Sequence, residues 1–144
     1  MVNFKRLAPM VVVAVLGTTV FVASPAQAYP LCNAEKIVTA SDNPSKKAYV
    51  PATSSGDTSC TLYEGLPYNM GVQTLQYSLN DCYAMNLVPD GYFGPKTKAA
   101  LQEVQRRIGV DDDGWYGPYT RDRLRFSPVD WTDICRKYNG PGGY

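Results

Sequence analysis

The chain of 144 residues contains no histidine. Histidine is the usual general base of hydrolase triads and a common ligand of zinc, so its absence argues against both kinds of site. The chain also lacks a strong net charge, because 14 Lys and Arg nearly balance 13 Asp and Glu. A nearly neutral surface does not create the positive field on which non-specific nucleic-acid binding depends. We therefore expect no nucleic-acid partner, and we favour a binding function over catalysis.

A hydrophobic run long enough for a stable membrane-spanning helix is also missing. The apolar run from Met10 to Val22 is short, follows Lys5 and Arg6, and precedes Ala26-Gln27-Ala28. A basic start, a short apolar segment and a small-x-small cleavage motif are the three parts of a secretory signal peptide. We predict that residues 1–28 are a signal peptide, and that the chain is secreted from residue 29 and then has no membrane contact.

Cysteine is scarce but even in number, with four residues in the predicted exported part. An even count in a small secreted chain indicates two disulfides. A metal site is a poor alternative, because no two cysteines are two or three residues apart and no histidine is available. Three pairings are possible. We favour Cys32–Cys60, which brackets a loop-rich segment, and Cys82–Cys135, which would join two predicted helices. We expect no metal and no cofactor.

Residues 29–68 are rich in Pro, Ser, Thr, Lys and Gly and show no helical periodicity. Two stretches, residues 36–40 and 48–51, have the composition of short strands, and residues 41–47 would form the turn between them. We interpret residues 29–68 as an irregular or two-stranded N-terminal arm that a disulfide holds to the rest of the chain.

Residues 69–126 have the pattern of a helical module. Apolar residues at helical spacing predict a helix over residues 71–83. A second helix would begin at Pro95 and end before Gly109, and a third would begin at Pro118 and include Leu124. In residues 127–144 we expect a last short helix over residues 131–138, which carries Cys135, and a flexible tail over residues 139–144.

An internal repeat is the most informative feature of the sequence. The segment Asp90-Gly91-Tyr92-Phe93-Gly94-Pro95-Lys96-Thr97 returns 23 residues later as Asp113-Gly114-Trp115-Tyr116-Gly117-Pro118-Tyr119-Thr120. Asp-Gly favours a tight turn, and Gly-Pro sets the first residue of a helix. Each unit therefore predicts a turn that carries two aromatic rings and leads into a helix.

With Val72-Gln73-Thr74-Leu75-Gln76-Tyr77-Ser78-Leu79 before them, the two repeats resemble the peptidoglycan-binding-domain-like modules of bacterial wall proteins. The similarity covers about residues 71–124, close to half of the predicted secreted chain. It implies a mainly α fold, a compact three-helix bundle, that attaches to peptidoglycan. The N-terminal arm would lie beside this bundle, tethered by a disulfide. The arm itself has a weaker similarity to those of small secreted actinobacterial wall proteins.

Candidate ligand-binding residues follow from the repeat. Sugar faces stack on aromatic rings, and arginine pairs its donors with carboxylates. We predict that Tyr92 and Trp115 point outward to the ligand, with Tyr119 and Arg121 nearby. The alternative for Trp115 is packing on the third helix or under the arm. The neighbouring rings of the two turns, Phe93 and Tyr116, are predicted to lie in the core, and no catalytic residue is expected.

The sequence favours a secreted, monomeric, non-catalytic protein that binds peptidoglycan through its glycan or its stem peptides. Two alternatives remain open. One is an extracellular protein-interaction or inhibitor module, in which Tyr49, Tyr63 and Tyr68 of the arm make the contact, since tyrosine is enriched at protein interfaces. The other is a small wall hydrolase that works through carboxylates, against which the missing histidine argues.

Overall fold

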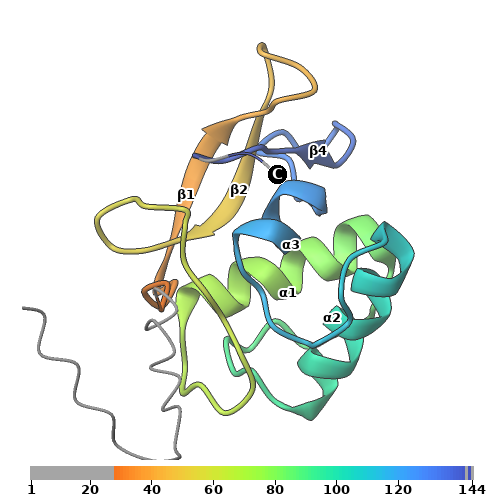
Figure 1. Ribbon diagram of the computed structural model, residues 1–144. Coiled ribbons are helices and arrows are strands. Elements are labelled where there is room, and N and C mark those ends of the chain that lie inside the picture. The colour runs from red at the N-terminus through yellow and green to blue at the C-terminus, as the bar shows by residue number, and fades with distance from the viewer. Residues whose placement is uncertain (1–27, 142, 144) are drawn as a thin grey trace, which may run out of the picture.

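The computed structural model describes residues 28–141 and residue 143, so the predicted signal peptide lies outside the described residues except for Ala28. Figure 1 shows α1 and α2 in the lower part of the molecule, with α3 beside them and the paired strands above. The described elements, in chain order, are β1 (Ala34–Thr39), β2 (Lys47–Ala52), α1 (Met70–Tyr83), α2 (Pro95–Ile108), α3 (Pro118–Arg123), β3 (Arg125–Phe126) and β4 (Arg136–Lys137). None of the helices in this described part is long and apolar enough to cross a membrane.

The helix boundaries agree with the residues that favour helix starts and ends. Asn69 caps α1, because its side-chain oxygen accepts hydrogen bonds from the amides of Gly71 at 2.7 Å and Val72 at 3.3 Å. Pro95 is the first residue of α2, and Gly109 ends it in the left-handed conformation with φ of 72°. The predicted first and second helices are confirmed, and α3 ends one residue before Leu124.

The two predicted strands of the N-terminal segment are also confirmed. β1 and β2 pair in antiparallel register, with Val38 opposite Ala48 and Lys36 opposite Val50. Val38, Ala48 and Val50 are buried on one face of this hairpin, and that face packs against α1. Val38 is the only buried residue of β1, so the pattern along this strand did not reveal a core face.

The prediction of a mainly α three-helix bundle is wrong. The described residues form three helices, of which α3 has only six residues, and two small antiparallel sheets. The two helices of 14 residues and the one short helix contribute only part of the buried cluster. Val38 and Val50 of the hairpin fill part of that core, so residues 29–68 are structurally integral to it rather than a tethered arm.

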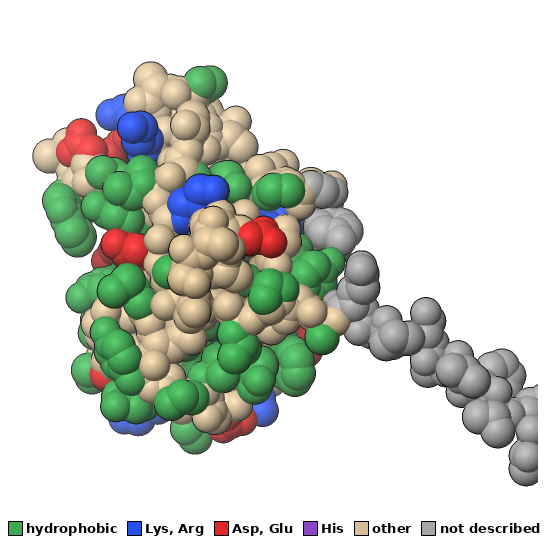
Figure 2. Space-filling model, turned by 90° about the vertical axis from the view of Figure 1, so that its left-hand side faces the viewer, with side chains coloured by type: hydrophobic (Ala, Val, Ile, Leu, Met, Phe, Trp, Pro, Cys, Tyr) green, Lys and Arg blue, Asp and Glu red, His purple; other side chains and the backbone are tan. Residues whose placement is uncertain are grey.

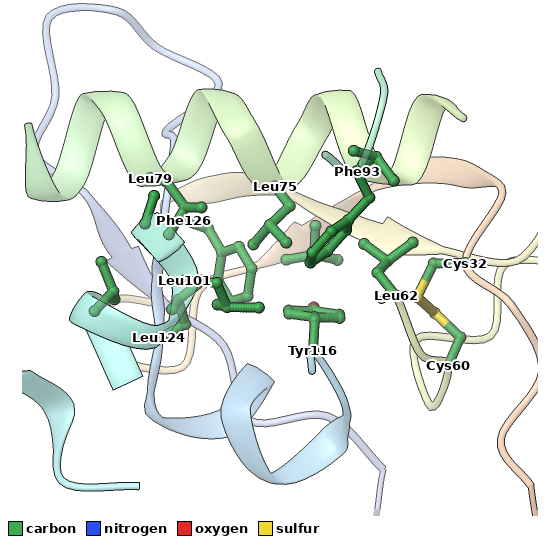
Figure 3. Packing of buried hydrophobic residues seen from close by; sticks show 14 of the residues in the cluster. Cys32, Cys60, Leu62, Leu75, Leu79, Phe93, Leu101, Tyr116, Leu124 and Phe126 are labelled. Atoms are coloured by element: carbon green, nitrogen blue, oxygen red, sulfur yellow. A yellow bond between two sulfur atoms is a disulfide. The ribbon is translucent and has the colours of Figure 1, made fainter. Parts of the chain in front are cut away.

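The core joins residues from every part of the described chain. Figure 3 shows Leu75, Phe93 and Tyr116 pointing into one interior region below α1, with Leu62 beside the Cys32–Cys60 bridge. Leu101 of α2 and Phe126 of β3 extend the same cluster. The core therefore continues from the disulfide-linked N-terminal segment to the strand after α3.

Both predicted disulfides are present, and the described residues include no free cysteine. Cys32–Cys60 lies in the core, where both residues are fully buried. Cys82–Cys135 is partly exposed and joins the last turn of α1 to the segment before β4. The two bridges thus attach both ends of the described chain to its centre.

The predicted helix over residues 131–138 is wrong. This segment forms turns and then β4, which pairs with β3 so that Arg125 lies opposite Lys137 and Phe126 opposite Arg136. Trp131 and Ile134 are largely exposed, so they do not supply the buried face that a packed helix requires. Backbone pairing with β3 and the Cys82–Cys135 disulfide hold this segment in place instead.

Candidate functional site

A buried glutamine holds each of the two repeated turns. In the first turn, Nε2 of Gln76 in α1 donates to a carboxylate oxygen of Asp90 at 3.0 Å, the carbonyl of Tyr92 at 3.1 Å and Oγ1 of Thr97 at 3.0 Å. The Gln76 carbonyl accepts a hydrogen bond from the Gly91 amide at 2.9 Å. One side chain of α1 therefore bonds the whole length of this turn.

The second turn repeats this arrangement atom for atom. Nε2 of Gln105 in α2 donates to Asp113 at 2.9 Å, to the Trp115 carbonyl at 2.9 Å and to Oγ1 of Thr120 at 3.2 Å, while its carbonyl accepts from the Gly114 amide at 2.9 Å. The sequence repeat thus corresponds to a repeated structural unit.

Sequence reasoning missed both glutamines as functional supports. They are 29 residues apart, whereas the turns are 23 residues apart, so neither falls inside the repeated segment. The turns also require glycine, because Gly91 and Gly114 have φ of 76° and 74°. The sequence feature that could have indicated these supports is a glutamine in the helix before each Asp-Gly turn.

Each repeated turn carries two aromatic rings, one pointing into the core and one pointing to solvent. Phe93 and Tyr116 are buried in the core, as predicted. Tyr92 and Trp115 are each 54% exposed, so both present a ring to solvent. The outward orientation predicted for this pair is therefore what the structure shows.

Each exposed ring is packed against a tyrosine from the segment before α1. Tyr63 stacks on Trp115 with ring centroids 5.0 Å apart, and Tyr68 meets Tyr92 edge to face at 6.0 Å. The alternative in which Trp115 packs under the N-terminal segment is thus partly realised, since one side of its ring is covered. We refer to these as the Trp115 pair and the Tyr92 pair.

Backbone hydrogen bonds fix this segment across both turns. Leu62 and Tyr116 exchange amide-to-carbonyl bonds of 3.0 and 2.9 Å, and the Gly65 amide donates to the Phe93 carbonyl at 2.9 Å. At the far end, the Asn69 amide donates to the Gly91 carbonyl at 2.9 Å. One continuous strip of chain therefore positions the second ring of each pair.

A hollow lies beside each pair. The hollow at Trp115 has a volume of about 320 Å³ and is lined by Tyr29, Thr61, Asp111, Asp113, Trp115, Tyr116, Gly117, Pro118, Tyr119 and Thr120. The hollow at Tyr92 has a volume of about 480 Å³ and is lined by Gln76, Asn86, Leu87, Val88, Asp90, Tyr92, Gly94, Pro95, Lys96 and Thr97. The repeat places equivalent residues in both, so the two hollows are related by the same duplication as the turns.

The other two predicted ligand-binding residues have different positions. Tyr119 is partly exposed, lines the hollow at Trp115, and has the Arg123 guanidinium 5.2 Å from its ring centroid. Arg121 is 0% exposed. Because no part of Arg121 reaches the surface, it does not present its guanidinium to a wall ligand in this conformation.

Arg121 instead joins three separate segments. Its Nε lies 2.7 Å from a carboxylate oxygen of Asp122, one terminal nitrogen donates to the Thr58 carbonyl at 3.0 Å, and the other donates to the Pro141 carbonyl at 3.4 Å. Asp122 also accepts from the Gly140 amide at 3.0 Å. Residues 140 and 141, predicted to lie in a flexible tail, are bonded to this buried ion pair.

The surface outside the hollows is rich in apolar side chains. Figure 2 shows hydrophobic side chains over much of one face, including its lower half at the height of α1 and α2 in Figure 1, with charged side chains scattered among and around them. The exposed aromatic residues of the two pairs are Tyr68, Tyr92 and Trp115. Exposed rings on rigid backbone suit ligands that stack, such as sugar faces.

The carboxylate of Asp90 in the first turn is stabilised as an anion. The Gln76 amide and the Tyr92 backbone amide donate to Asp90, and these hydrogen bonds lower the pKa of its carboxyl. Among the described residues no group of three or more His, Cys, Asp or Glu is arranged to hold a metal ion. Stacking and hydrogen bonding are the chemistry that this surface offers.

Comparison with known proteins finds a family similarity over part of the chain. Residues 69–124 match the family model described as "Putative peptidoglycan binding domain". The chain is also similar to an uncharacterized protein in the bpoA1 3' region of Kitasatospora aureofaciens, with 45% identity over 62 residues. That match covers 42% of this chain and 52% of the relative, so the chain spans about half the length of the curated relative it matches. No solved structure matches the chain.

The matched residues include α1, α2, α3, both glutamines and both repeated turns. The hairpin, the strip with Tyr63 and Tyr68, and the strands β3 and β4 lie outside the match. The two disulfides and the family of the module are consistent with an extracellular location. Residues 69–124 of this chain are therefore similar to peptidoglycan-binding domains.

Proposed function

We propose that this is a secreted, non-catalytic protein that binds the glycan strands of peptidoglycan through the Trp115 pair and the Tyr92 pair. The observation that carries the proposal is the duplicated turn, in which a buried glutamine fixes a half-exposed ring beside a hollow. Sugar rings present C–H faces that stack on such aromatic surfaces. Two equivalent positions suit a polymer whose units repeat.

The spacing of the two pairs favours one ligand that contacts both. Tyr63 and Tyr68 belong to the same strip of chain, and five residues span at most roughly 18 Å when fully extended. A strand of a few sugars therefore reaches from one pair to the other. Two weak contacts on one strand add affinity, because the second contact forms without a new loss of translational freedom.

The state of Asp90 supports a binding role rather than hydrolysis. Acid catalysis of glycoside cleavage uses a carboxyl whose pKa is raised, so that it still carries a proton near neutral pH. Hydrogen bonds from Gln76 and Tyr92 lower the pKa of Asp90 instead. Its carboxylate already serves the turn, which favours a fixed platform for a ligand.

The tyrosines of the alternative protein-binding arm support the same proposal. Tyr63 and Tyr68 lie against Trp115 and Tyr92, so they belong to one surface with the module and not to a separate arm. We therefore assign them to the wall-binding surface.

Cosedimentation with purified insoluble peptidoglycan tests the function. The disulfide-bonded protein should pellet with the wall material, and the bound fraction should persist at 1 M salt, where the Debye length is about 3 Å and surface charge pairs are screened. Trp115→Ala and Tyr92→Ala should each reduce binding, and the double variant should abolish it. Trp131→Ala is the matched control, since Trp131 is an exposed tryptophan outside both hollows.

Circular dichroism and thermal unfolding establish that each variant is folded. If the folded double variant pelleted as well as the parent, the aromatic pairs would not be the binding surface. A folded parent that stayed in the supernatant would overturn the proposed function. Clearing of a wall suspension by the parent would show hydrolysis and overturn the non-catalytic part.

A further inference from the structure

A third hollow lies away from the two turns, where the hairpin and the segment after β3 pack on α1. Its volume is about 240 Å³, and its lining residues are Glu35, Tyr49, Thr74, Tyr77, Asp81, Ser127 and Trp131. None of these residues lines either hollow of the repeated turns. Glu35, Tyr49, Ser127 and Trp131 lie outside the family match, so this hollow exists only because the additional segments pack on the module.

Three elements supply the wall of this hollow. Thr74, Tyr77 and Asp81 follow one another at helical spacing along α1 and share one face of it. The hairpin contributes Glu35 and Tyr49. The Tyr49 amide donates to the Ser127 carbonyl at 3.0 Å, and this backbone bond joins the hairpin to the segment after β3. Both sides of the hollow therefore rest on hydrogen-bonded backbone.

Two carboxylates line the hollow without an ion-pair partner among the described residues. Glu35 accepts a bond of 3.4 Å from the Thr74 hydroxyl, and Asp81 accepts one of 2.7 Å from the Ser127 hydroxyl. No ion pair among the described residues includes either carboxylate, and no lysine or arginine lines the hollow. Both residues are exposed, so their carboxylates are accessible to a cationic ligand from solvent.

Aromatic rings complete the lining. Tyr77 is 43% exposed and Trp131 is 80% exposed, and Tyr49 is partly buried beside them. The face of an aromatic ring attracts a cation, and desolvation strengthens that attraction. Rings together with carboxylates therefore select a positively charged group over a neutral group of the same shape.

We propose that this hollow is a second binding site, and that its ligand is a primary alkylammonium group. The volume is below the roughly 300 Å³ at which pockets for whole drug-sized ligands begin, so a terminal group fits better than a whole molecule. A primary ammonium has three N–H donors, and the carboxylates of Glu35 and Asp81 and the hydroxyl of Ser127 offer acceptors. The site is independent of wall binding by the two aromatic pairs.

Titration of ¹⁵N-labelled protein with n-butylammonium chloride tests the site directly. Saturable chemical-shift changes should be confined to the amides of Tyr49, Tyr77 and Ser127 and to the amide and indole N–H of Trp131. The dissociation constant should be on the order of 1 to 10 mM, as befits a ligand of five non-hydrogen atoms. 1-Butanol has the same size without the charge and should bind at least fivefold more weakly, and potassium chloride controls for ionic strength.

Charge-removing variants locate the ligand. Glu35→Gln and Asp81→Asn keep the hydroxyl partners of both side chains and should each weaken n-butylammonium binding about three- to fivefold, and Trp131→Ala should weaken it about two- to fivefold. Asp111→Asn is the matched control, because it removes the same charge from the hollow at Trp115 and should leave the affinity unchanged.

The absence of saturable shifts would overturn the proposal, as would equal binding of 1-butanol. So would unchanged affinity in a folded Glu35→Gln/Asp81→Asn double variant. Wall cosedimentation of these variants distinguishes this proposal from the proposed function. Loss of n-butylammonium binding should leave pelleting with peptidoglycan intact.

Discussion

Tyr63 stacks on Trp115 with ring planes 25° apart, although Trp115 lies in the second repeated turn and Tyr63 lies outside the family match. One side of the Trp115 ring is therefore occupied by protein, and the other is left for solvent or ligand. A stacked neighbour also restricts the orientations of Trp115, which lowers the entropy that a ligand must remove on binding. Tyr63 thus supports the ring of Trp115 from one side.

This relationship predicts coupling between the two rings in wall binding. Tyr63→Ala should weaken binding about two- to tenfold, because aromatic pairs contribute about 0.5–1.5 kcal/mol. The loss in the Tyr63→Ala/Trp115→Ala double variant should be smaller than the sum of the single losses. Binding isotherms from cosedimentation measure all three, with Tyr77→Ala as a control at an exposed tyrosine of α1. Additive losses would contradict a shared platform.

The buried glutamines predict a large effect on stability. Gln105→Ala should lower the free energy of unfolding by about 2–4 kcal/mol, because it leaves the buried Gly114 amide and the acceptors of the turn unpaired. Gln76→Ala should do the same in the first turn. Gln102→Ala removes an exposed bond to the Asp112 carbonyl and should change stability by less than about 0.5 kcal/mol. Urea unfolding compares the variants, and a similar small loss at all positions would refute the anchoring role.

Local sequence signals predicted the positions of the two long helices and of the hairpin strands. Pro95 at a helix start and Gly109 at a helix end act within one turn of backbone, so their effects can be read from the sequence. The disulfides were predicted from the count of cysteines and the segments that they bracket. The outward and inward rings of the two turns followed from the repeat.

Long-range packing was not predictable in the same way. Nothing in residues 29–68 indicated that Val38 and Val50 would cover α1, because the buried residues of so short a hairpin are few. Arg121 was predicted to lie near the ligand, yet its guanidinium is buried and bonds the carbonyls of Thr58 and Pro141. Such burial depends on which distant segments meet, which local periodicity does not encode.

The contact between Gly140 and Arg121 predicts how the C-terminal segment is held. A Cβ atom at position 140 would lie 2.2 Å from Cζ of Arg121, which is far inside contact distance. Gly140→Ala should therefore displace the segment and lower the free energy of unfolding by about 1–3 kcal/mol. Gly143→Ala is the control, since a Cβ there meets nothing within 4 Å. Carboxypeptidase digestion should proceed faster only in Gly140→Ala, and equal rates would show that the segment is not held here.

The two disulfides should differ in their resistance to reduction. Cys32 and Cys60 are fully buried, whereas Cys82 and Cys135 are partly exposed, and a thiolate must reach a sulfur atom to open a bridge. Under native conditions dithiothreitol should reduce Cys82–Cys135 first. Alkylation followed by peptide mass spectrometry identifies the opened pair. Reduction of both bridges at the same rate in folded protein would mean that opening requires global unfolding.

The acidic end of the pH range should weaken the attachment of β4. Asp133 bonds Arg136, the first residue of β4, and lies 3.2 Å from Lys46, and these contacts lower the pKa of its carboxyl from 3.8 to about 2. A lowered pKa in the folded state gives a stabilisation that is present above the unfolded pKa and is lost as the pH falls toward 2. Asp133→Asn should therefore destabilise the protein at pH 6 and have little effect near pH 2. Urea unfolding at both pH values measures this, with Asp111→Asn as the control at an exposed aspartate without an ion pair among the described residues. An Asp133→Asn effect of the same size at both pH values would exclude a role for its charge.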